Sequence, residues 1–96
     1  MSDETRMHID ALVQLLSSVT DPEDCRALLE DMCTYKELEN MAERCHAAKL
    51  LLEGNTYNQV MEQVEISSAT LSRGSRCVQY GAGYRKLLKK EQNEEA

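Results

Sequence analysis

Residues 56–79 read TYNQVMEQVEISSATLSRGSRCVQ, and two helix starts follow each other closely in this stretch. Thr56 with Gln59 three residues later forms a capping box, in which each side chain satisfies a backbone N–H of the other residue. This box opens a helix of only about eight residues. Ser67 or Ser68 then caps a second helix, which is expected to extend to about Gln79.

The apolar residues of this stretch fit two helices that share a core. Val60 and Val64 lie on one face of the first helix. Ile66 falls in the turn, and Leu71 can pack back from the second helix. Two short helices joined by about three residues are typical of a helix-turn-helix, in which the start of the second helix enters the DNA major groove. Other helical proteins contain similar corners, so the pattern alone is moderately specific.

The second helix begins with small polar residues and continues with arginines, and both residue types contact DNA. The helix N-terminus attracts phosphate through its unpaired backbone N–H groups. Arg76 can hold a guanine in a bidentate contact worth about 1–3 kcal/mol, or it can hold a phosphate. The alternative is a solvated face with ordinary helix caps. The predicted DNA-binding residues are Ser67, Ser68, Ala69, Thr70, Ser72, Arg73 and Arg76.

The charge of the chain is unevenly distributed. The formal net charge is −6, and this total argues against binding to phosphate. However, residues 1–65 hold 14 acidic and 5 basic residues, residues 66–90 hold six basic residues and no acidic one, and residues 91–96 add three glutamates. The positive block begins just before the predicted second helix. An acid-free basic segment on an acidic body points to double-stranded DNA as the partner.

Two helices are expected at the start of the chain. The first runs from about Asp3 to Ser18, and the second runs from Pro22, with Asp21 as its N-cap, to about Cys33. Apolar residues recur at helical spacing in both, which predicts a buried stripe on each helix. The stripes are Leu12, Leu15, Leu16 and Val19 in the first helix, and Cys25, Leu28, Leu29 and Met32 in the second.

The third helix is expected to be the longest. Thr34 and Glu37 form a capping box at its start, and Gly54 can take the left-handed conformation that ends it. A last helix is expected over residues 84–90, after a Gly-Ala-Gly bend, and residues 91–96 form a polar tail. The apolar stripe of the third helix, with one polar member, is Leu38, Met41, Ala42, Cys45, Lys49 and Leu52.

The size and composition favour an all-α fold with a shared core. The 96 residues are expected to form a single helical domain over residues 1–90. Apolar residues make up 42% of the chain, but the aromatic residues are only four tyrosines. A lone domain of this size buries only about 60–65% of the surface that its unfolded chain exposes. In a homodimer, two copies would share one larger core.

Other classes of protein fit the sequence poorly. The acidic first residues and the lack of a long apolar run predict a cytoplasmic protein with no signal peptide and no membrane contact. The four cysteines include no C-x-x-C pair, so they are expected to be core or half-buried thiols, with no metal site. His8 and His46 have no paired nucleophile, and no catalytic residue or enzymatic activity is predicted.

The chain resembles the Trp repressor superfamily, and its YerC/YecD-like bacterial branch most closely, at residues 54–57 (GNTY), 68–75 (SATLSRGS) and 76–81 (RCVQYG). The similarity covers roughly residues 10–88. The resemblance implies a six-helix all-α fold and an intertwined homodimer with two helix-turn-helix heads. It also implies a sequence-specific transcriptional regulator that represses by occluding a promoter, with activation as the alternative.

The resemblance also implies an amino-acid site. In tryptophan repressors, two arginines enclose the indole of L-tryptophan, and one of them holds its carboxylate together with a threonine. This chain departs from the family pattern at Glu65, where glycine is usual, and at Cys77, where serine is usual. An amino-acid corepressor such as L-tryptophan is therefore an expectation. The positions that match the site are Thr34, Arg44, Arg73 and Gly74.

Two alternatives stay open at the level of sequence. The basic segment can dock an acidic protein, which would make the chain a helical interaction module. Each matched residue of the amino-acid site also has a simpler role. Thr34 can serve simply as a helix cap, Arg44 can pair with nearby glutamates, and Arg73 can bind phosphate.

Overall fold

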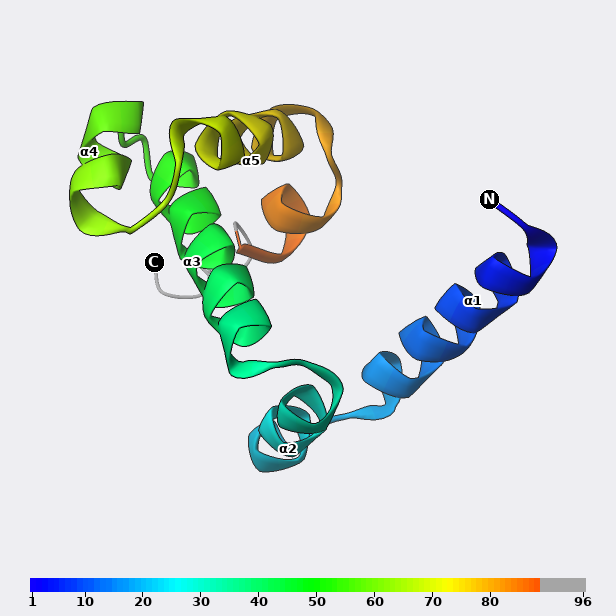
Figure 1. The fold of residues 1–96 in the computed structure, drawn as a ribbon. Coiled ribbons are helices and arrows are strands. Elements are labelled where there is room, and N and C mark those ends of the chain that lie inside the picture. The colour runs from blue at the N-terminus through cyan, green and yellow to red at the C-terminus, as the bar shows by residue number, and fades with distance from the viewer. Residues whose placement is uncertain (89–96) are drawn as a thin grey trace. The chain divides into compact units, whose positions relative to one another are not determined.

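The computed structural model describes residues 1–88, which are helical apart from short connections (Figure 1). The predicted all-α fold class is confirmed. The predicted last helix (84–90) is described as far as residue 88, and the predicted tail 91–96 lies outside the described residues. The helices are α1 (Asp3–Ser18), α2 (Pro22–Met32), α3 (Tyr35–Leu52), α4 (Tyr57–Gln63) and α5 (Ser68–Tyr80), and residues 83–88 form a sixth helical segment.

Side-chain caps begin α1 and α2. The Ser2 hydroxyl accepts a hydrogen bond from the Thr5 N–H at 3.1 Å. The Asp21 carboxylate accepts one from the Asp24 N–H at 3.3 Å, and Pro22 follows at the first helical position. Each cap satisfies a backbone N–H that has no partner inside the helix. Both helices therefore begin where the sequence predicts, and α2 ends one residue earlier than expected.

Capping boxes begin α3 and α4. The Thr34 N–H donates to Glu37 Oε1 at 2.8 Å, and the Glu37 N–H donates to Thr34 Oγ1 at 3.1 Å. The corresponding distances between Thr56 and Gln59 are 2.8 Å and 3.2 Å. Gly54 ends α3 with a φ of +97°, a conformation that L side chains rarely adopt. The short connection after Gly54 leads directly into α4.

The chain divides into two compact units, Met1–Leu38 and Glu39–Ala96. The core of the second unit lies where the end of α3 meets α4 and α5 (Figure 1). Val60 of α4 and Leu71 of α5 are completely buried there. The expected packing of the two short helices is thus confirmed. The core residues are Ala47, Leu50, Val60, Val64 and Leu71, with Leu51 and Ile66 partly buried against them.

α3 buries a different face from the one predicted from its apolar spacing. Its buried residues are Ala47, Ala48 and Leu50. The residues of the predicted stripe are half-buried or exposed, and Met41 is 40% exposed. Because side chains at helical spacing share a face, Ala47 and Leu51 lie opposite that stripe. α4 and α5 cover this opposite face, and the predicted stripe is left uncovered.

The predicted stripes of α1 and α2 are not buried within the chain. Leu12, Leu15 and Leu16 are 37%, 48% and 40% exposed, and Met32 of α2 is 44% exposed. Neither helix contains a buried residue. The expectation of buried stripes is wrong for the chain alone, because the described part of the chain offers nothing that covers them. Apolar surface of this kind is more stable when it is removed from water.

Candidate nucleic-acid interface

α4 and α5 form a helix-turn-helix against the end of α3 (Figure 1). Val64 is the C-cap of α4, and its N–H donates to the Val60 carbonyl at 2.9 Å. Ser67 is the N-cap of α5, and its hydroxyl accepts from the Thr70 N–H at 3.2 Å. Val64 is buried on one side of this turn and Leu71 on the other. The turn is therefore fixed by a cap at each end and by apolar contact across it.

α5 has a buried face and an exposed face. Its buried residues are Leu71, Ser75 and Val78. Ala69, Arg73 and Arg76 are exposed and follow one another at spacings of four and three residues. Residues at these spacings lie on the same side of a helix. The first half of α5 thus presents a continuous face to solvent that carries two arginines.

The structure assigns different positions to the predicted DNA-binding residues. The Ser67 hydroxyl caps α5 and also donates to Thr70 Oγ1 at 2.9 Å. Thr70 is half-buried and lines a cavity beside the helix. Ser67 and Thr70 therefore stabilise the start of α5 itself. Ser68, Ala69, Arg73 and Arg76 are exposed, and Ser72 is half-buried on the flank of the helix.

The electrostatic surroundings of α5 suit an anion. Its first turn holds no acidic residue. Over residues 1–88, the arginines at 73 and 76 form no ion pair with a carboxylate, so their charge is available to a partner. Glu65 is exposed in the turn before the helix and supplies a nearby negative charge. A phosphate that approaches α5 is thus attracted by Arg73 and Arg76 and repelled by Glu65.

The end of α5 is connected closely to the helical segment 83–88. The Gly81 N–H donates to the Cys77 carbonyl at 2.8 Å. A Cβ atom at Gly81 would lie 2.6 Å from that carbonyl oxygen, which is closer than real Cβ contacts allow. Arg85 Nη2 donates to the Gln79 carbonyl at 2.8 Å, where a helix end leaves carbonyl groups unpaired. These contacts fix the bend at residues 81–83.

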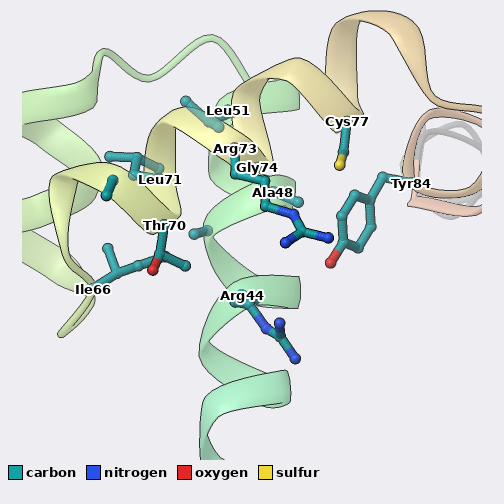
Figure 2. Close-up of a pocket in the computed structure, with 12 residues that line it drawn as sticks. Arg44, Ala48, Leu51, Ile66, Thr70, Leu71, Arg73, Gly74, Cys77 and Tyr84 are labelled. Carbon is teal, nitrogen blue, oxygen red and sulfur yellow. The ribbon is translucent and has the colours of Figure 1, made fainter.

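A cavity of about 340 Å³ lies beside α5 (Figure 2). Ala47, Ala48 and Leu51 of α3 supply small and apolar side chains to its wall. Arg44 of α3 and Arg73 of α5 also line it and bring two guanidinium groups to the same space. This volume is near the lower end of the range for small-molecule sites. Guanidinium groups bind carboxylates and phosphates well, because their donors match the two oxygens of either group.

Three of the four residues predicted for an amino-acid site meet at this cavity. Arg44, Arg73 and Gly74 all line it. A Cβ atom at Gly74 would meet no other atom within 4 Å, so the wall beside this glycine is open. Thr34 belongs to the unit Met1–Leu38 and caps α3. The hydrogen bonds from the Thr34 N–H and hydroxyl hold the pKa of the exposed Glu37 carboxyl below its usual value of 4.5.

Sequence reasoning missed several cavity residues. Ala47 lies on the face of α3 opposite the predicted stripe, whereas Ala48 lies at the edge of that stripe, three residues after Cys45, and was not included in it. Tyr84 also lines the cavity, from the helical segment after the bend. An aromatic residue directly after a glycine-rich bend is a signal that could have indicated it. The direction of its ring depends on how the bend at 81–83 folds back, and local spacing does not determine that.

Within residues 1–88, no group of three or more His, Cys, Asp or Glu side chains could hold a metal ion. Among the same residues, no helix combines the length and the apolar character that a membrane span needs. All four cysteines are free; three are half-buried and Cys45 is exposed. The expectation of a half-buried thiol is wrong for Cys45, because it lies on the uncovered stripe of α3.

Over residues 1–88, the fold and the site define a helix-turn-helix protein whose regular secondary structure is helical, with two arginines at a cavity beside α5. The chain belongs to the Trp repressor family. The family description "Trp repressor protein" matches residues 7–92. The resemblance carried by residues 54–57, 68–75 and 76–81 is therefore confirmed.

Individual relatives agree with this assignment. The chain is 38% identical over 73 residues to the uncharacterized protein YerC of Bacillus subtilis, a match that covers 76% of this chain and 70% of YerC. A Trp repressor candidate from Staphylococcus aureus has a similar crystal structure, with a TM-score of 0.84, 27% identity and coverage of 96% and 95% of the two chains. A TrpR-like protein from Eubacterium eligens gives a TM-score of 0.83, 31% identity and 90% coverage of each chain.

Proposed function

We propose that this protein is a sequence-specific DNA-binding transcriptional regulator that acts as a repressor in the cytoplasm. The observation that carries this proposal is the exposed face of α5, where Ala69, Arg73 and Arg76 follow a helix start without acidic residues. Membership of the Trp repressor family supports it. α5 would be the reading helix, which occupies the major groove, and the bound protein would cover a promoter. Such an action needs no catalytic residue.

The proposed functional unit is a homodimer. The uncovered stripes of α1, α2 and α3 are apolar surface that a second copy can cover. Burial of such surface contributes about 25 cal/mol per Å². Residues 1–90 of each copy would then act as one domain, with the first three helices in the dimer core. The two reading helices would enter successive major grooves about 34–36 Å apart on a pseudo-palindromic site.

Selection from a random DNA pool, followed by affinity measurements on the recovered sequence, tests the proposal. The logarithm of the binding constant should fall with the logarithm of salt concentration, with a slope of about −0.9 for each neutralised phosphate. Arg76→Ala should weaken binding by about 1–3 kcal/mol, and it should relax sequence choice if the contact is to a base. Arg6→Ala, at an exposed position of α1, is the matched control and should leave sequence choice unchanged.

Two outcomes would count against DNA reading. The first is the absence of salt-sensitive binding to any DNA at micromolar protein. The second is equal behaviour of Arg76→Ala and Arg6→Ala. Capture of an acidic protein that survives nuclease treatment, by a chain without DNA affinity, would favour the interaction module instead.

A second proposal concerns an effector in the cavity beside α5. Arg44 and Arg73 offer two guanidinium groups, and the open wall at Gly74 leaves space next to them. These features suit the carboxylate of an amino acid. L-Tryptophan is the effector that the family resemblance implies. Calorimetry with L-tryptophan and with an amino-acid mixture tests the site, and the absence of both heat and a change in DNA affinity would remove it.

A further inference from the structure

Tyr80 is the last residue of α5, and its side chain is 84% exposed. Within the described residues 1–88, its hydroxyl group has no hydrogen-bond partner. Tyrosine is enriched at interfaces, because its ring supplies apolar contact area and its hydroxyl group supplies a hydrogen-bond donor. A tyrosine that exposes both parts to water is therefore a candidate contact residue for a binding partner.

Tyr80 continues the exposed face of α5 that carries Ala69, Arg73 and Arg76. It follows Arg73 by seven residues and Arg76 by four, which are about two turns and one turn of a helix. The buried residues of α5 lie on the opposite side of the helix. Tyr80 therefore lies on the same side of α5 as the two arginines, at the far end of their row.

The two ends of this face are widely separated along α5. Eleven residues separate Ala69 from Tyr80, which corresponds to about 16 Å along the helix axis. The major groove is only about 12 Å wide. When the first half of α5 occupies the groove, the end of the helix lies beyond the bases, at the sugar–phosphate backbone that borders the groove. Tyr80 is the residue of the exposed face that lies at this end.

The charges around the end of α5 permit a phosphate there. The last carbonyl groups of a helix carry a partial negative charge, which repels anions. Arg85 Nη2 donates to the Gln79 carbonyl at 2.8 Å and so places a guanidinium group at this end. Residues 66–88 contain no acidic residue. The positive charge of Arg85 therefore offsets the helix end, and a phosphate that reaches Tyr80 meets no carboxylate of this segment.

We propose that Tyr80 is a phosphate-contacting residue of the DNA interface. Its hydroxyl group donates to a backbone phosphate at the edge of the groove that α5 reads. Such a contact fixes the position of the helix in the groove and carries no base preference of its own. This role rests on the proposed DNA reading by α5, and it extends the contact face beyond Arg76, where the predicted set of DNA-binding residues ends.

Affinity for the DNA sequence that selection recovers, measured over a series of salt concentrations, tests this role. Tyr80→Phe removes only the hydroxyl group and should weaken binding about tenfold, because a hydrogen bond to a charged group is stronger than a neutral one. Since tyrosine carries no charge, the slope of the logarithm of the binding constant against the logarithm of salt concentration should not change. Loss of a cation that holds a phosphate would change this slope by about 0.9. Single-base variants of the DNA site should keep their order of affinity.

Duplexes that carry one uncharged methylphosphonate at a time locate the contact. At the phosphate that Tyr80 holds, this replacement should weaken binding of the unaltered chain more than binding of Tyr80→Phe, because both changes remove the same hydrogen bond. Tyr35→Phe, at a tyrosine that is 82% exposed, is the matched control. It should bind every duplex as the unaltered chain does. Circular dichroism shows whether each variant is folded.

Several results would overturn the role of Tyr80. Equal affinity of the unaltered chain and Tyr80→Phe for the recovered DNA would show that the hydroxyl group makes no contact. Equal effects of every methylphosphonate on the two proteins would show that the lost contact is not to a phosphate. If Tyr80→Phe binds DNA normally and Tyr80→Ala has a smaller mass in light scattering, the ring serves contact between chains instead. These three results leave DNA reading by α5 intact, whereas the absence of salt-sensitive DNA binding by the unaltered chain would remove both proposals.

Discussion

At the scale of single residues, the bend after α5 illustrates how one position constrains its surroundings. Gly81 has an ordinary negative φ of −81°, so its backbone conformation alone does not require glycine. The requirement comes from the distance to the Cys77 carbonyl, where an added Cβ would lie at 2.6 Å. The bend also determines where Tyr84 and Arg85 lie. A change at Gly81 should therefore affect both the stability of α5 and the shape of the cavity.

Gly81→Ala is predicted to destabilise the protein by about 1–3 kcal/mol, because the backbone must shift to admit the methyl group. Urea unfolding followed by circular dichroism measures this change in the free energy of unfolding. Gly83→Ala is the control, since a Cβ atom there meets nothing within 4 Å. Equal stability of the two variants would contradict the steric explanation.

At the scale of elements, α3 has two apolar sides with different roles. One side carries Ala47 and Leu50 and packs in the core with α4 and α5. The other side carries the stripe that apolar spacing predicted, and it is uncovered. The N-terminus of α3 depends on the capping box of Thr34 and Glu37. This box contains an ionisable group, so the stability of the helix start depends on pH.

Acidification is predicted to weaken the start of α3. The pKa of Glu37 is lowered in the folded chain, since the charged carboxylate accepts hydrogen bonds from Thr34. The stabilising contribution is therefore fully present above the unfolded-state pKa, and it is lost as pH falls through the lower folded-state pKa. The Thr34 amide shift and the free energy of unfolding, measured from neutral pH to below pH 4.5, report this loss.

Glu37→Gln is the control for this titration. Glutamine can retain the reciprocal hydrogen bonds of a capping box but does not ionise. Its Thr34 amide shift should not follow the acidic transition that the unaltered chain shows. A transition of the same size in both proteins would assign the effect to another group.

At the scale of the whole molecule, the single chain leaves much apolar surface exposed to water, which is unfavourable. α1 contains no buried residue, although its leucines recur at the spacing of a buried stripe. α2 shows the same disagreement between pattern and burial. The covered core in residues 39–88 is small and consists of one cluster. A second copy that covers the stripes would resolve this disagreement.

Leu15→Glu is predicted to dissociate the proposed dimer, because it places a charge on a stripe that a second copy would bury. Light scattering at micromolar concentration should give twice the chain mass of 10.9 kDa for the unaltered protein and the single mass for the variant. Arg6→Glu introduces the same residue at an exposed polar position of α1 and should leave the mass unchanged. A monomeric mass for the unaltered chain would contradict the dimer.

Local signals in the sequence predicted the boundaries of the elements well. The capping boxes at Thr34 and Thr56, the Asp21–Pro22 start and the Gly54 end all appear in the structure. Each signal acts through hydrogen bonds or backbone conformation within a few residues of its own position. Because such interactions do not depend on the rest of the fold, they can be predicted from the neighbouring residues in the sequence.

The sequence by itself determined the helices, the helix-turn-helix and the candidate residues of α5. Only the tertiary structure decided which face of α3 is covered, that Arg44, Arg73 and Gly74 share a cavity, and that Tyr84 lies there with them. The physical reason is the range of the interactions. Caps and helical spacing act along the chain, whereas the cavity depends on the path of the chain through the bend at 81–83 and on contacts between helices distant in sequence.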